Sequence, residues 1–366
     1  MPVCWRRRAT GFAQATPVYH VIDLGTLGGT SSAAWGLNDA GQVVGSSSTS
    51  SGHQSHAFLY SDGVMTDLGT FGGTYSFAGD INNKGHVVGT ASTSGNTTYR
   101  AFLYSNGVMT DLGTLGGEHG GASGINDRGQ VAGRSHPGDA ENHAFLYSEG
   151  VMADLGTLGG EYSSAGAIND HGQVVGAAQR SGDLSIYAFL YSDGKMTDLG
   201  GLAPVGVYAG GQSSARDINN HGQVVGYFTI EDLEIHPFLY SNGTMIDLGT
   251  FGGLYGEAWA INDTGQVVGS SNDSNGRQQG FLYSNSILQN LNDLIDPLSG
   301  WTIAEAHDIN ESGDIAAVGF HPSVGSRALL LEYIGPAVGG VPEPGTLALM
   351  VIAMAGMIGF RRNWEH

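Results

Sequence analysis

Three aspartates occupy one position of a repeated motif. Asp80, Asp217 and Asp308 each stand two residues before the asparagine of a predicted turn. Carboxylates that face a common channel could hold a metal ion, or act as acid and base on a polysaccharide if two of them lay about 5–9.5 Å apart. Glu305 is a further candidate for such a pair. We favour another role, in which the three aspartates accept hydrogen bonds from neighbouring main-chain groups.

Motifs with a known catalytic geometry are absent from the sequence. It contains no H-E-x-x-H, no G-x-S-x-G, no phosphate-binding loop and no cysteine pair, and its one cysteine is Cys4. His86, His171 and His221 occupy variable positions of turns, where exposed side chains are expected. The I-N-D-x-G turns lack the ligand spacing of a calcium loop. We therefore expect no catalytic residue, no metal site and no cofactor, and a protein that is not an enzyme.

Candidate ligand-binding residues lie in connections of variable length. The distance from the aspartate of a D-L-G motif to the next turn asparagine is 15 residues in most copies, but 21 from Asp198 to Asn219. Loops on a rigid scaffold usually carry binding sites, and large rigid rings gain contact area at low entropic cost. Rings gathered around a channel mouth would suit a sugar or a peptide, and packing against the neighbouring repeat is the alternative. The candidates are Tyr75, His119, Tyr162, Tyr208, Tyr255 and Trp301.

Three phrases recur along the chain in a fixed order with a period near 44 residues. They are D-L-G-T-[LF]-G-G, I-N-[DN]-x-G-[QH]-V-[VA]-G and A-F-L-Y-S, and each has seven copies when decayed ones are included. The unit that starts at Asp67 contains four short extended segments, 64–71, 76–81, 86–91 and 100–105, joined by tight turns. A repeat of this kind predicts an all-β protein with four-stranded blades, a β-propeller.

The strand count predicts how such a ring would close. Tyr19–Leu27 resembles the last strand of a repeat, and Arg327–Tyr333 lacks that partner. We therefore expect a seven-bladed propeller in which the N-terminal strand completes the last blade; an open β-solenoid is the alternative. Four residues before each turn asparagine stands an alanine, which we expect at a crowded axis. These alanines are Ala34, Ala78, Ala122, Ala165, Ala215, Ala258 and Ala306.

Charge narrows the classes of partner. The chain carries a formal net charge of −20, with only 13% charged residues. Affinity for nucleic acid comes from lysine and arginine that neutralise phosphates, so we expect no nucleic-acid partner. The acidic surface favours a neutral or cationic ligand, or a polysaccharide bridged by calcium.

The repeat is similar to the HAF-family extracellular repeat, which is named for a His-Ala-Phe that stands here at His56-Ala57-Phe58 and His143-Ala144-Phe145. The similarity spans nearly the whole array, and the later copies depart from it by one or two residues. In layout the unit also resembles a kelch blade, without the kelch tryptophan. The resemblance implies an exported repeat protein and implies no reaction.

The C-terminal segment resembles the PEP-CTERM sorting signal of Gram-negative bacteria. Pro342, Glu343 and Pro344 precede an apolar run that ends at Arg361 and Arg362. The run is slightly short of a membrane span, but flanking residues and the two arginines can extend it. The resemblance implies export, a transient inner-membrane anchor, and removal of the tail by an exosortase, a membrane protease. The delivered protein would then lie in the cell envelope, at the outer surface or in the extracellular matrix.

These expectations divide the chain into four parts. Residues 1–15 are interpreted as a truncated or wrongly started signal peptide, because Arg6–Arg8 and the A-x-A site at 13–15 lack an apolar stretch between them. Residues 16–335 form the propeller, 336–344 a linker with the PEP motif, and 345–366 a transmembrane helix with a basic tail.

The leading hypothesis is an exported, surface- or matrix-associated, non-enzymatic propeller. It would act as a binding or scaffold protein, with an exopolysaccharide or an envelope protein as partner, and would meet the membrane only through its C-terminal helix. The alternatives are a polysaccharide-active enzyme with carboxylates at the channel, and a purely structural matrix protein.

Overall fold

The structure is a computed structural model that describes residues 17–52, 54–138, 141–200, 211–230 and 234–336. Tyr19–Tyr333 form one compact unit, which contains the repeats. The other unit, Met1–Val18 with Ile334–His366, is described only at 17–18 and 334–336.

The strands pair into three sheets of four strands and two sheets of eight. One four-stranded sheet has the order β1-β28-β27-β26 and contains β1 (Pro17–Asp23), β26 (Thr302–Ile309), β27 (Ile315–His321) and β28 (Gly325–Pro336). The second contains β10 (Gly120–Ile125), β11 (Val131–Ser135), β12 (His143–Ser148) and β13 (Val151–Asp154). The third contains β14 (Gly159–Ile168), β15 (Val174–Arg180), β16 (Ile186–Ser192) and β17 (Lys195–Gly200).

Each eight-stranded sheet consists of two antiparallel sets of four strands that one parallel bridge joins, Ser55 to Tyr75 in the first sheet and Ile235 to Tyr255 in the second. The first comprises β2 (Gly28–Leu37), β3 (Val43–Thr49), β4 (Ser55–Ser61), β5 (Val64–Gly69), β6 (Gly72–Ile81), β7 (Val87–Thr93), β8 (Tyr99–Ser105) and β9 (Val108–Asp111). The second comprises β18 (Ser213–Ile218), β19 (Val224–Thr229), β20 (Ile235–Ser241), β21 (Thr244–Asp247), β22 (Gly252–Ile261), β23 (Val267–Asp273), β24 (Gln278–Ser284) and β25 (Ile287–Asn290).

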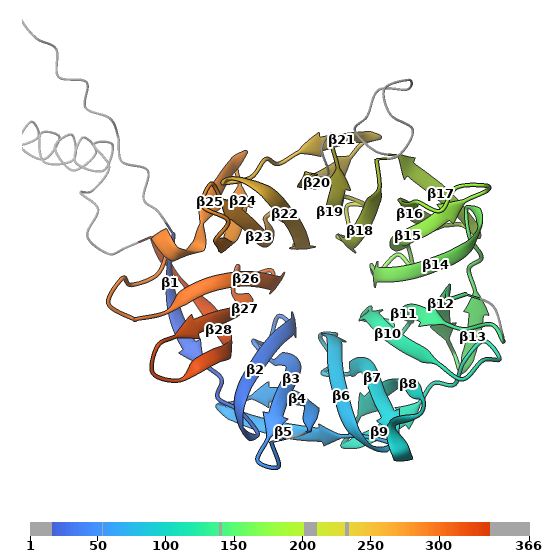
Figure 1. The fold of residues 1–366 in the computed structure, drawn as a ribbon, viewed down its shortest axis with the longest axis horizontal. Helices are drawn as coiled ribbons and strands as arrows, with labels where there is room; N and C mark the ends of the chain where they lie inside the picture. Colours follow the sequence, from blue (N-terminus) through green and yellow to red (C-terminus); the bar gives the residue numbers. More distant parts are fainter. Residues whose placement is uncertain (1–16, 53, 139–140, 201–210, 231–233, 337–366) are drawn as a thin grey trace, which may run out of the picture. The chain divides into compact units, whose positions relative to one another are not determined.

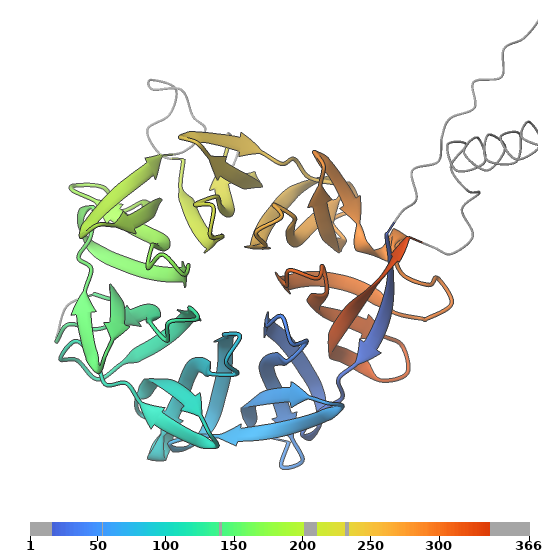
Figure 2. The same cartoon turned by 180° about the vertical axis from the view of Figure 1, so that it is seen from behind.

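The prediction of an all-β fold is confirmed for the described residues. Their helical elements are two short 3₁₀ turns, η1 (Ser94–Asn96) and η3 (Leu291–Asp293). The sheets stand around a common centre, and the first strand of each repeat lies nearest to it (Figure 1, and from behind in Figure 2). These inner strands are β2, β6, β10, β14, β18, β22 and β26.

The first and last strands of the array lie side by side, as the sequence predicts. β1 is the neighbour of β28 in the sheet order, and the N–H of Leu24 donates to the carbonyl of Ala328 at 3.1 Å. Arg327 lies 4.0 Å from Asp23. The N-terminal strand therefore covers an edge of the last sheet, which would otherwise present unpaired main-chain groups.

The hydrophobic core lies between successive repeats. In one cluster Val44 and Ala57 of the first repeat pack with Ala78, Val87 and Phe102 of the second. The cluster that joins the last repeat to the first is built from equivalent positions, with Ala316, Ala328 and Leu330 from one side and Ala34, Val43 and Phe58 from the other. The phenylalanines of the A-F-L-Y-S motif are completely buried in these clusters, which explains their recurrence.

The repeated alanines are close to the axis in part. All are buried, with exposed fractions of 0–2%; Ala122, Ala165 and Ala215 line the cavity at the axis, and Ala34 and Ala78 pack into the core between repeats. The axis has room for large side chains such as Trp35 and Trp259, which line a cavity there. Alanine is required because a larger side chain would press on the valines and the phenylalanine of that core.

The turn asparagines form a closed ring of hydrogen bonds. The side-chain amide of each donates to the main-chain carbonyl of the asparagine in the next repeat, as Asn38 does to Asn82 at 3.1 Å, and Asn310 of the last repeat donates to Asn38 at 3.3 Å. The residue directly after each turn asparagine forms a second ring, in which its main-chain N–H donates to the side chain of the equivalent residue in the next repeat. Asp39, for example, donates its N–H to the side chain of Asn83, and its own side chain accepts the N–H of Glu311. The asparagine motif therefore links each repeat to the next, a role that the sequence did not indicate.

Candidate binding site at the axis

Every inner strand carries a β-bulge directly after its buried alanine. The pairing register skips one residue between Ala34 and Gly36, and the same skip recurs in the other inner strands. A bulge leaves its extra residue out of the ladder and redirects its side chain. The skipped residues are Trp35, Gly79, Ser123, Gly166, Arg216, Trp259 and His307.

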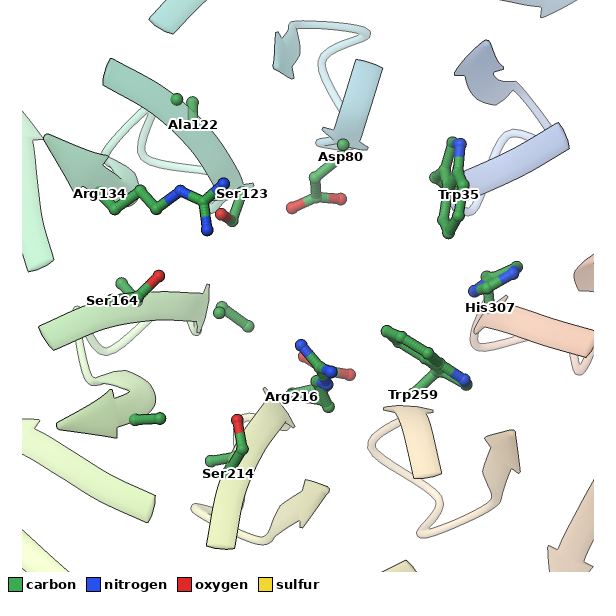
Figure 3. A pocket seen from close by; sticks show the side chains of 18 of the residues that line it. Trp35, Asp80, Ala122, Ser123, Arg134, Ser164, Ser214, Arg216, Trp259 and His307 are labelled. Atoms are coloured by element: carbon green, nitrogen blue, oxygen red, sulfur yellow. The ribbon is translucent and has the colours of Figure 1, made fainter. Parts of the chain in front are cut away.

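All of these bulge residues line one cavity of about 780 Å³, which Figure 3 shows from close by. A volume of this size is typical of small-molecule sites, which span about 300–1,000 Å³. The lining is asymmetric. Arg216, Trp259, His307 and Trp35 come from consecutive repeats when the last is followed by the first, whereas the bulge residues of the remaining repeats are glycine or serine. The bulge residues are thus large on one side of the cavity and small on the other, where Phe77, Arg134 and Tyr162 line it from other positions.

The large side chains form a continuous wall. The rings of Trp35 and His307 have centroids 4.3 Å apart, and those of His307 and Trp259 are 5.1 Å apart. The guanidinium carbon of Arg216 lies 4.5 Å from the Trp259 ring and 5.3 Å from that of Tyr227. Each member therefore supports its neighbour, and cation–π attraction holds the arginine against the indole. We call these four residues, Arg216, Trp259, His307 and Trp35, the aromatic wall.

Two glutamates behind the aromatic wall fix its polar members. Glu257 is buried, accepts from Nε of Arg216 at 2.5 Å and receives the hydroxyl of Tyr255. Glu305 lies 2.9 Å from Nε2 of His307, and the hydrogen bond to that ring lowers the pKa of the glutamate. Burial, followed by the bond to Glu257, raises the pKa of the Tyr255 hydroxyl. The wall is therefore preorganised, because its orientation does not depend on a ligand.

Two polar atoms of the aromatic wall lack a partner. Nδ1 of His307 and Nε1 of Trp259 are buried and make no hydrogen bond within the described residues. The His307 side chain is only 2% exposed. Buried polar atoms without a partner are rare in proteins, and each needs an explanation. Because both atoms are buried, a molecule in the cavity does not reach them in this conformation.

The opposite side of the cavity carries a cation. Arg134 of β11 lines the cavity, and Figure 3 shows it across from Trp35, His307 and Trp259. It makes no ion pair with any carboxylate in the described ranges. Its guanidinium therefore offers several N–H donors to a molecule in the cavity.

The three aspartates of the repeated motif join neighbouring repeats. Asp80 accepts from the N–H of Ile81 in its own repeat and from that of Ile125 in the next, at 2.7 and 2.8 Å. Asp217 and Asp308 do the same for two further pairs of repeats. The hydrogen bonding to main chain that the sequence predicted is confirmed. Each aspartate accepts one main-chain N–H from each of two consecutive repeats, so three aspartates serve six of the seven repeats. Among the described residues, only the equivalent N–H of Ile168 has no aspartate as its acceptor.

Burial raises the pKa values of these three aspartates. Burial raises the pKa of Asp80 to about 7, although the N–H groups of Ile125 and Ile81 lower it. Burial likewise raises the pKa of Asp217 to about 6. The pKa of Asp308 is raised well above its usual value, first by burial and then by repulsion from Asp80 and Asp217. The three groups therefore share one electrostatic environment.

The carboxylates considered for an enzyme are engaged elsewhere. Both oxygens of Asp217 and of Asp308 accept main-chain N–H groups, and a complete repeat separates the two residues. Glu305 is bound by His307 and by Gln278. No cluster of three or more histidine, cysteine, aspartate or glutamate side chains that could hold a metal occurs within the described residues.

Only some of the six aromatic candidates from the sequence lie at or near the axial cavity. Tyr162 lines the cavity, and Tyr255 reaches it indirectly through Glu257. Tyr75 is 48% exposed on β6, His119 contacts the ring of His136 at 5.5 Å, and Trp301 contacts His321 at 5.1 Å; these three do not line the cavity. Tyr208 lies outside the described residues. Ligand binding by these six residues stays a prediction.

The sequence interpretation missed the bulge residues. A signal was present, because the residue after the invariant alanine is the most variable one in a motif that is otherwise nearly constant, A-x-[GDA]-[LI]-N. Trp, Gly, Ser, Gly, Arg, Trp and His follow one another at this place. A position that varies within an otherwise constant inner strand indicates a side chain that does not pack in the core.

Comparisons with known proteins agree with a propeller-like, exported protein. A family described as "Protein of unknown function (DUF3466)" matches residues 119–244, and the PEP-CTERM protein-sorting motif matches residues 340–363. The chain therefore carries a sorting signal that marks it for export and for processing by an exosortase. No curated protein matches the chain, and none of these matches identifies the HAF repeat.

Solved structures share the fold at low identity. A puromycin-hydrolysing peptidase from Mycobacterium tuberculosis is 13% identical with a TM-score of 0.52, over 90% of this chain and 57% of the peptidase. The β-propeller domain of the Trilobed protease from Pyrococcus furiosus, described as having an open velcro topology, is 9% identical with a TM-score of 0.51, over 85% of this chain and 99% of that domain. The chain spans little more than half of the peptidase, and the likeness concerns the fold alone.

Several predictions for the termini fall outside the described residues. They concern the signal-peptide remnant at 1–15, the PEP residues Pro342, Glu343 and Pro344, and the apolar segment at 345–366 with Arg361 and Arg362. No helix in the part of the chain that the structure describes is long and apolar enough to cross a membrane.

Proposed function

We propose that the protein is an exported, closed, seven-bladed β-propeller that binds a neutral glycan in its axial cavity without turning it over. It acts at the cell surface or in the extracellular matrix. The observation that carries the proposal is the aromatic wall, which lines a cavity of about 780 Å³ opposite Arg134.

Closure into seven blades is supported by three independent contacts. The asparagine ring returns from Asn310 to Asn38, the core between the last and first repeats matches the others, and β1 lies beside β28. Each contact links the two ends of the array through groups that also join interior repeats. An open solenoid would leave the terminal repeats without them.

A glycan suits the chemistry of the cavity. One face of a sugar ring presents C–H groups, which pack favourably on the electron-rich face of an indole such as Trp35 or Trp259. Its hydroxyl groups need donors and acceptors, which Arg134 and Ser123 supply. Charges of both signs surround the cavity, and Glu257 neutralises Arg216. A neutral ligand therefore fits better than a bare polyanion, in agreement with the net charge of −20.

Binding without turnover is favoured by the state of the carboxylates. A glycosidase needs one carboxyl to protonate the leaving group and another to attack or to activate water. Both oxygens of each aspartate here are held by main-chain N–H groups. These bonds hold the aspartates in their place between neighbouring blades.

Export follows from the sorting motif at residues 340–363. In this proposal the apolar run at 345–366 holds the chain in the inner membrane until the exosortase removes the tail. The propeller is then delivered to the envelope or to the extracellular matrix, where exopolysaccharide is the partner.

The test is a screen of the purified protein on a glycan array, followed by titration calorimetry of the bound glycans. We expect one site per chain and a loss of affinity of at least about tenfold in Trp259→Ala and in Trp35→Ala, because each removes one ring of the wall. The exposed Val108→Ala serves as the control. Binding that survives both tryptophan substitutions, or an array without any bound glycan, would refute the proposal, and release of shorter sugars would reveal an enzyme.

A further inference from the structure

The inner strand β6 carries two exposed aromatic rings next to the axial cavity. Phe77 lines the cavity and is 44% exposed, and Tyr75, two residues earlier, is 48% exposed. Side chains two positions apart in a strand point to the same face of the sheet. In the sixth repeat the equivalent side chains, Tyr255 and Glu257, are joined by a hydrogen bond, as a shared face requires. We call Phe77 and Tyr75 the β6 track.

The β6 track leads out of the cavity. Gly79 and Asp80 line the cavity where β6 approaches the asparagine ring. A strand rises about 3.3 Å per residue, so Phe77 lies about 7 Å and Tyr75 about 13 Å from Gly79 along β6, in the direction away from that ring. Tyr75 does not line the cavity. Its ring therefore stands beyond the end of the cavity that lies away from the asparagine ring, which we call the outer mouth.

No other repeat carries aromatic rings at both of these positions, which lie one and three residues before the repeated alanine. The residues there are Ala33 and Ser31, Gly121 and His119, Ser164 and Tyr162, Ser214 and Gln212, Glu257 and Tyr255, and Glu305 and Ile303. Packing between repeats therefore does not require two rings at this place. Those of β6 leave about half of their surface open to a ligand.

From this arrangement we infer that the protein binds an oligosaccharide longer than the axial cavity, and that the sugar rings outside the cavity stack on the β6 track. The inference rests on the proposed glycan binding, to which it adds a second subsite and a minimum length of ligand. The C–H face of a sugar ring packs well on an aromatic ring. Both rings of the track belong to one strand of a paired sheet, so little ordering is needed when a ligand binds.

Tyr75 provides the specific variants. Tyr75→Ala removes the outer ring of the β6 track and leaves the lining of the cavity complete. Because the side chain is half exposed, we expect an unchanged melting temperature. Tyr75→Phe keeps the ring and removes only the hydroxyl group. The matched control is Leu254→Ala, which removes a 68% exposed apolar side chain from the equivalent strand of the sixth repeat, β22.

The experiment is calorimetric titration of the purified protein with the disaccharides and hexasaccharides of α-1,4-glucan, β-1,4-glucan and β-1,4-mannan, and with those of any other neutral glycan that the array identifies. For the glycan that binds, we expect the hexasaccharide to bind at least about tenfold more tightly than the disaccharide. Tyr75→Ala should weaken the hexasaccharide by at least about fivefold and leave the disaccharide within about twofold. Tyr75→Phe and Leu254→Ala should leave both affinities unchanged.

The outcomes separate this inference from the proposed function. Equal affinities for disaccharide and hexasaccharide would show that the ligand ends within the cavity, and they overturn the inference although glycan binding stands. A Tyr75→Ala variant that binds the hexasaccharide normally, or that loses affinity equally for both oligosaccharides, also overturns it, as does an equal loss in Tyr75→Phe. If no glycan binds on the array or in solution, the proposed function fails, and the inference fails with it.

Discussion

The side-chain amide of Asn310 donates to the main-chain carbonyl of Asn38, 3.3 Å away and 272 positions earlier in the chain. Its carbonyl oxygen meanwhile accepts the N–H of Asp314 within its own turn. Asn126, in the interior of the array, makes the same two kinds of contact with Asn169 and Gln130. The last repeat is therefore joined to the first by the same bond that joins any two neighbours.

Substitution of the closing asparagine should destabilise the whole ring. Asn310→Ala removes one of the two donors to the carbonyl of Asn38, which keeps only the N–H of Gly41, and it removes the acceptor of the Asp314 N–H. We expect a loss of about 1–3 kcal/mol in the free energy of unfolding. Urea denaturation measures this loss, with Asn126→Ala as the reference. A closed ring predicts similar losses in both variants, whereas an open array predicts a clearly smaller loss for Asn310→Ala.

Asp80 should make stability depend on pH. Its pKa is about 7 in the folded protein, against an ordinary value of 3.8 for an aspartate. Between these values the folded state keeps a proton that the unfolded chain has lost, so the free energy of unfolding decreases as the pH rises from about 4 to 7. The contribution of this one group has a slope of at most about 1.4 kcal/mol per pH unit.

Thermal denaturation between pH 4.5 and 8 tests this dependence. Asp80→Ala introduces the residue that stands at the equivalent position 167, and it should flatten the pH dependence relative to the unmodified protein. Glu118→Ala, which removes an exposed acid, should leave the slope unchanged. Equal slopes for all three proteins would show that Asp80 does not titrate as described.

Substitution by leucine should destabilise the protein at Ala122 but not at Ser123, its neighbour in β10. Ala122 is buried in the core between repeats with Val88 and Phe145, so Ala122→Leu should cost about 1–3 kcal/mol through overpacking. Ser123 is the bulge residue and faces the cavity, so Ser123→Leu should change stability by less than about 0.5 kcal/mol. Denaturation midpoints that are equal for both variants would contradict the bulge geometry.

The histidine of H-A-F and the aspartate of D-L-G form a pair across the outer strands. Nδ1 of His56 lies 2.8 Å from Asp67, whose other oxygen accepts the N–H of Gly69 at 2.8 Å. Arg100 stands at the position of the histidine in another repeat, with its Nε 4.0 Å from Asp111. His56→Arg should therefore be neutral within about 0.5 kcal/mol, whereas Asp67→Ala, which also removes the turn contact, should cost about 1 kcal/mol. Chemical denaturation of the two variants checks this order.

The repeat pattern predicts the strands well, because turn chemistry and hydrophobic alternation are local. The turn at Asn82 closes with Gly85 at a φ of 74°, as the sequence indicates. One boundary differs: Gly72 begins β6 instead of breaking a strand, because the Thr70 hydroxyl accepts its N–H and donates to Gly73. The buried phenylalanines and alanines also follow from their recurrence, although the alanines pack into the core between repeats as well as against the axial cavity.

The candidate site was predicted less well, for a geometrical reason. Loop length shows where repeats diverge, but it does not show which way a side chain points, so Tyr75 and Trp301 were grouped with Tyr162 although only the last lines the cavity. A bulge reverses the direction of one side chain without changing the hydrophobic pattern around it. The contribution of Trp35 and Trp259 became visible only once the strand register was known.

Each bulge residue stands outside the strand ladder and outside the core that joins the repeats. A substitution there leaves the core between repeats unchanged. It does affect its neighbours at the axis, because the rings of the aromatic wall contact one another and a side chain at Gly166 would meet two main-chain oxygens at 3.0 Å. Proteins with this ring and other residues at these positions would keep the fold and change their ligand. The array then resembles a set of interchangeable recognition elements on a constant frame, in which new specificity arises by point substitution and requires no new loop.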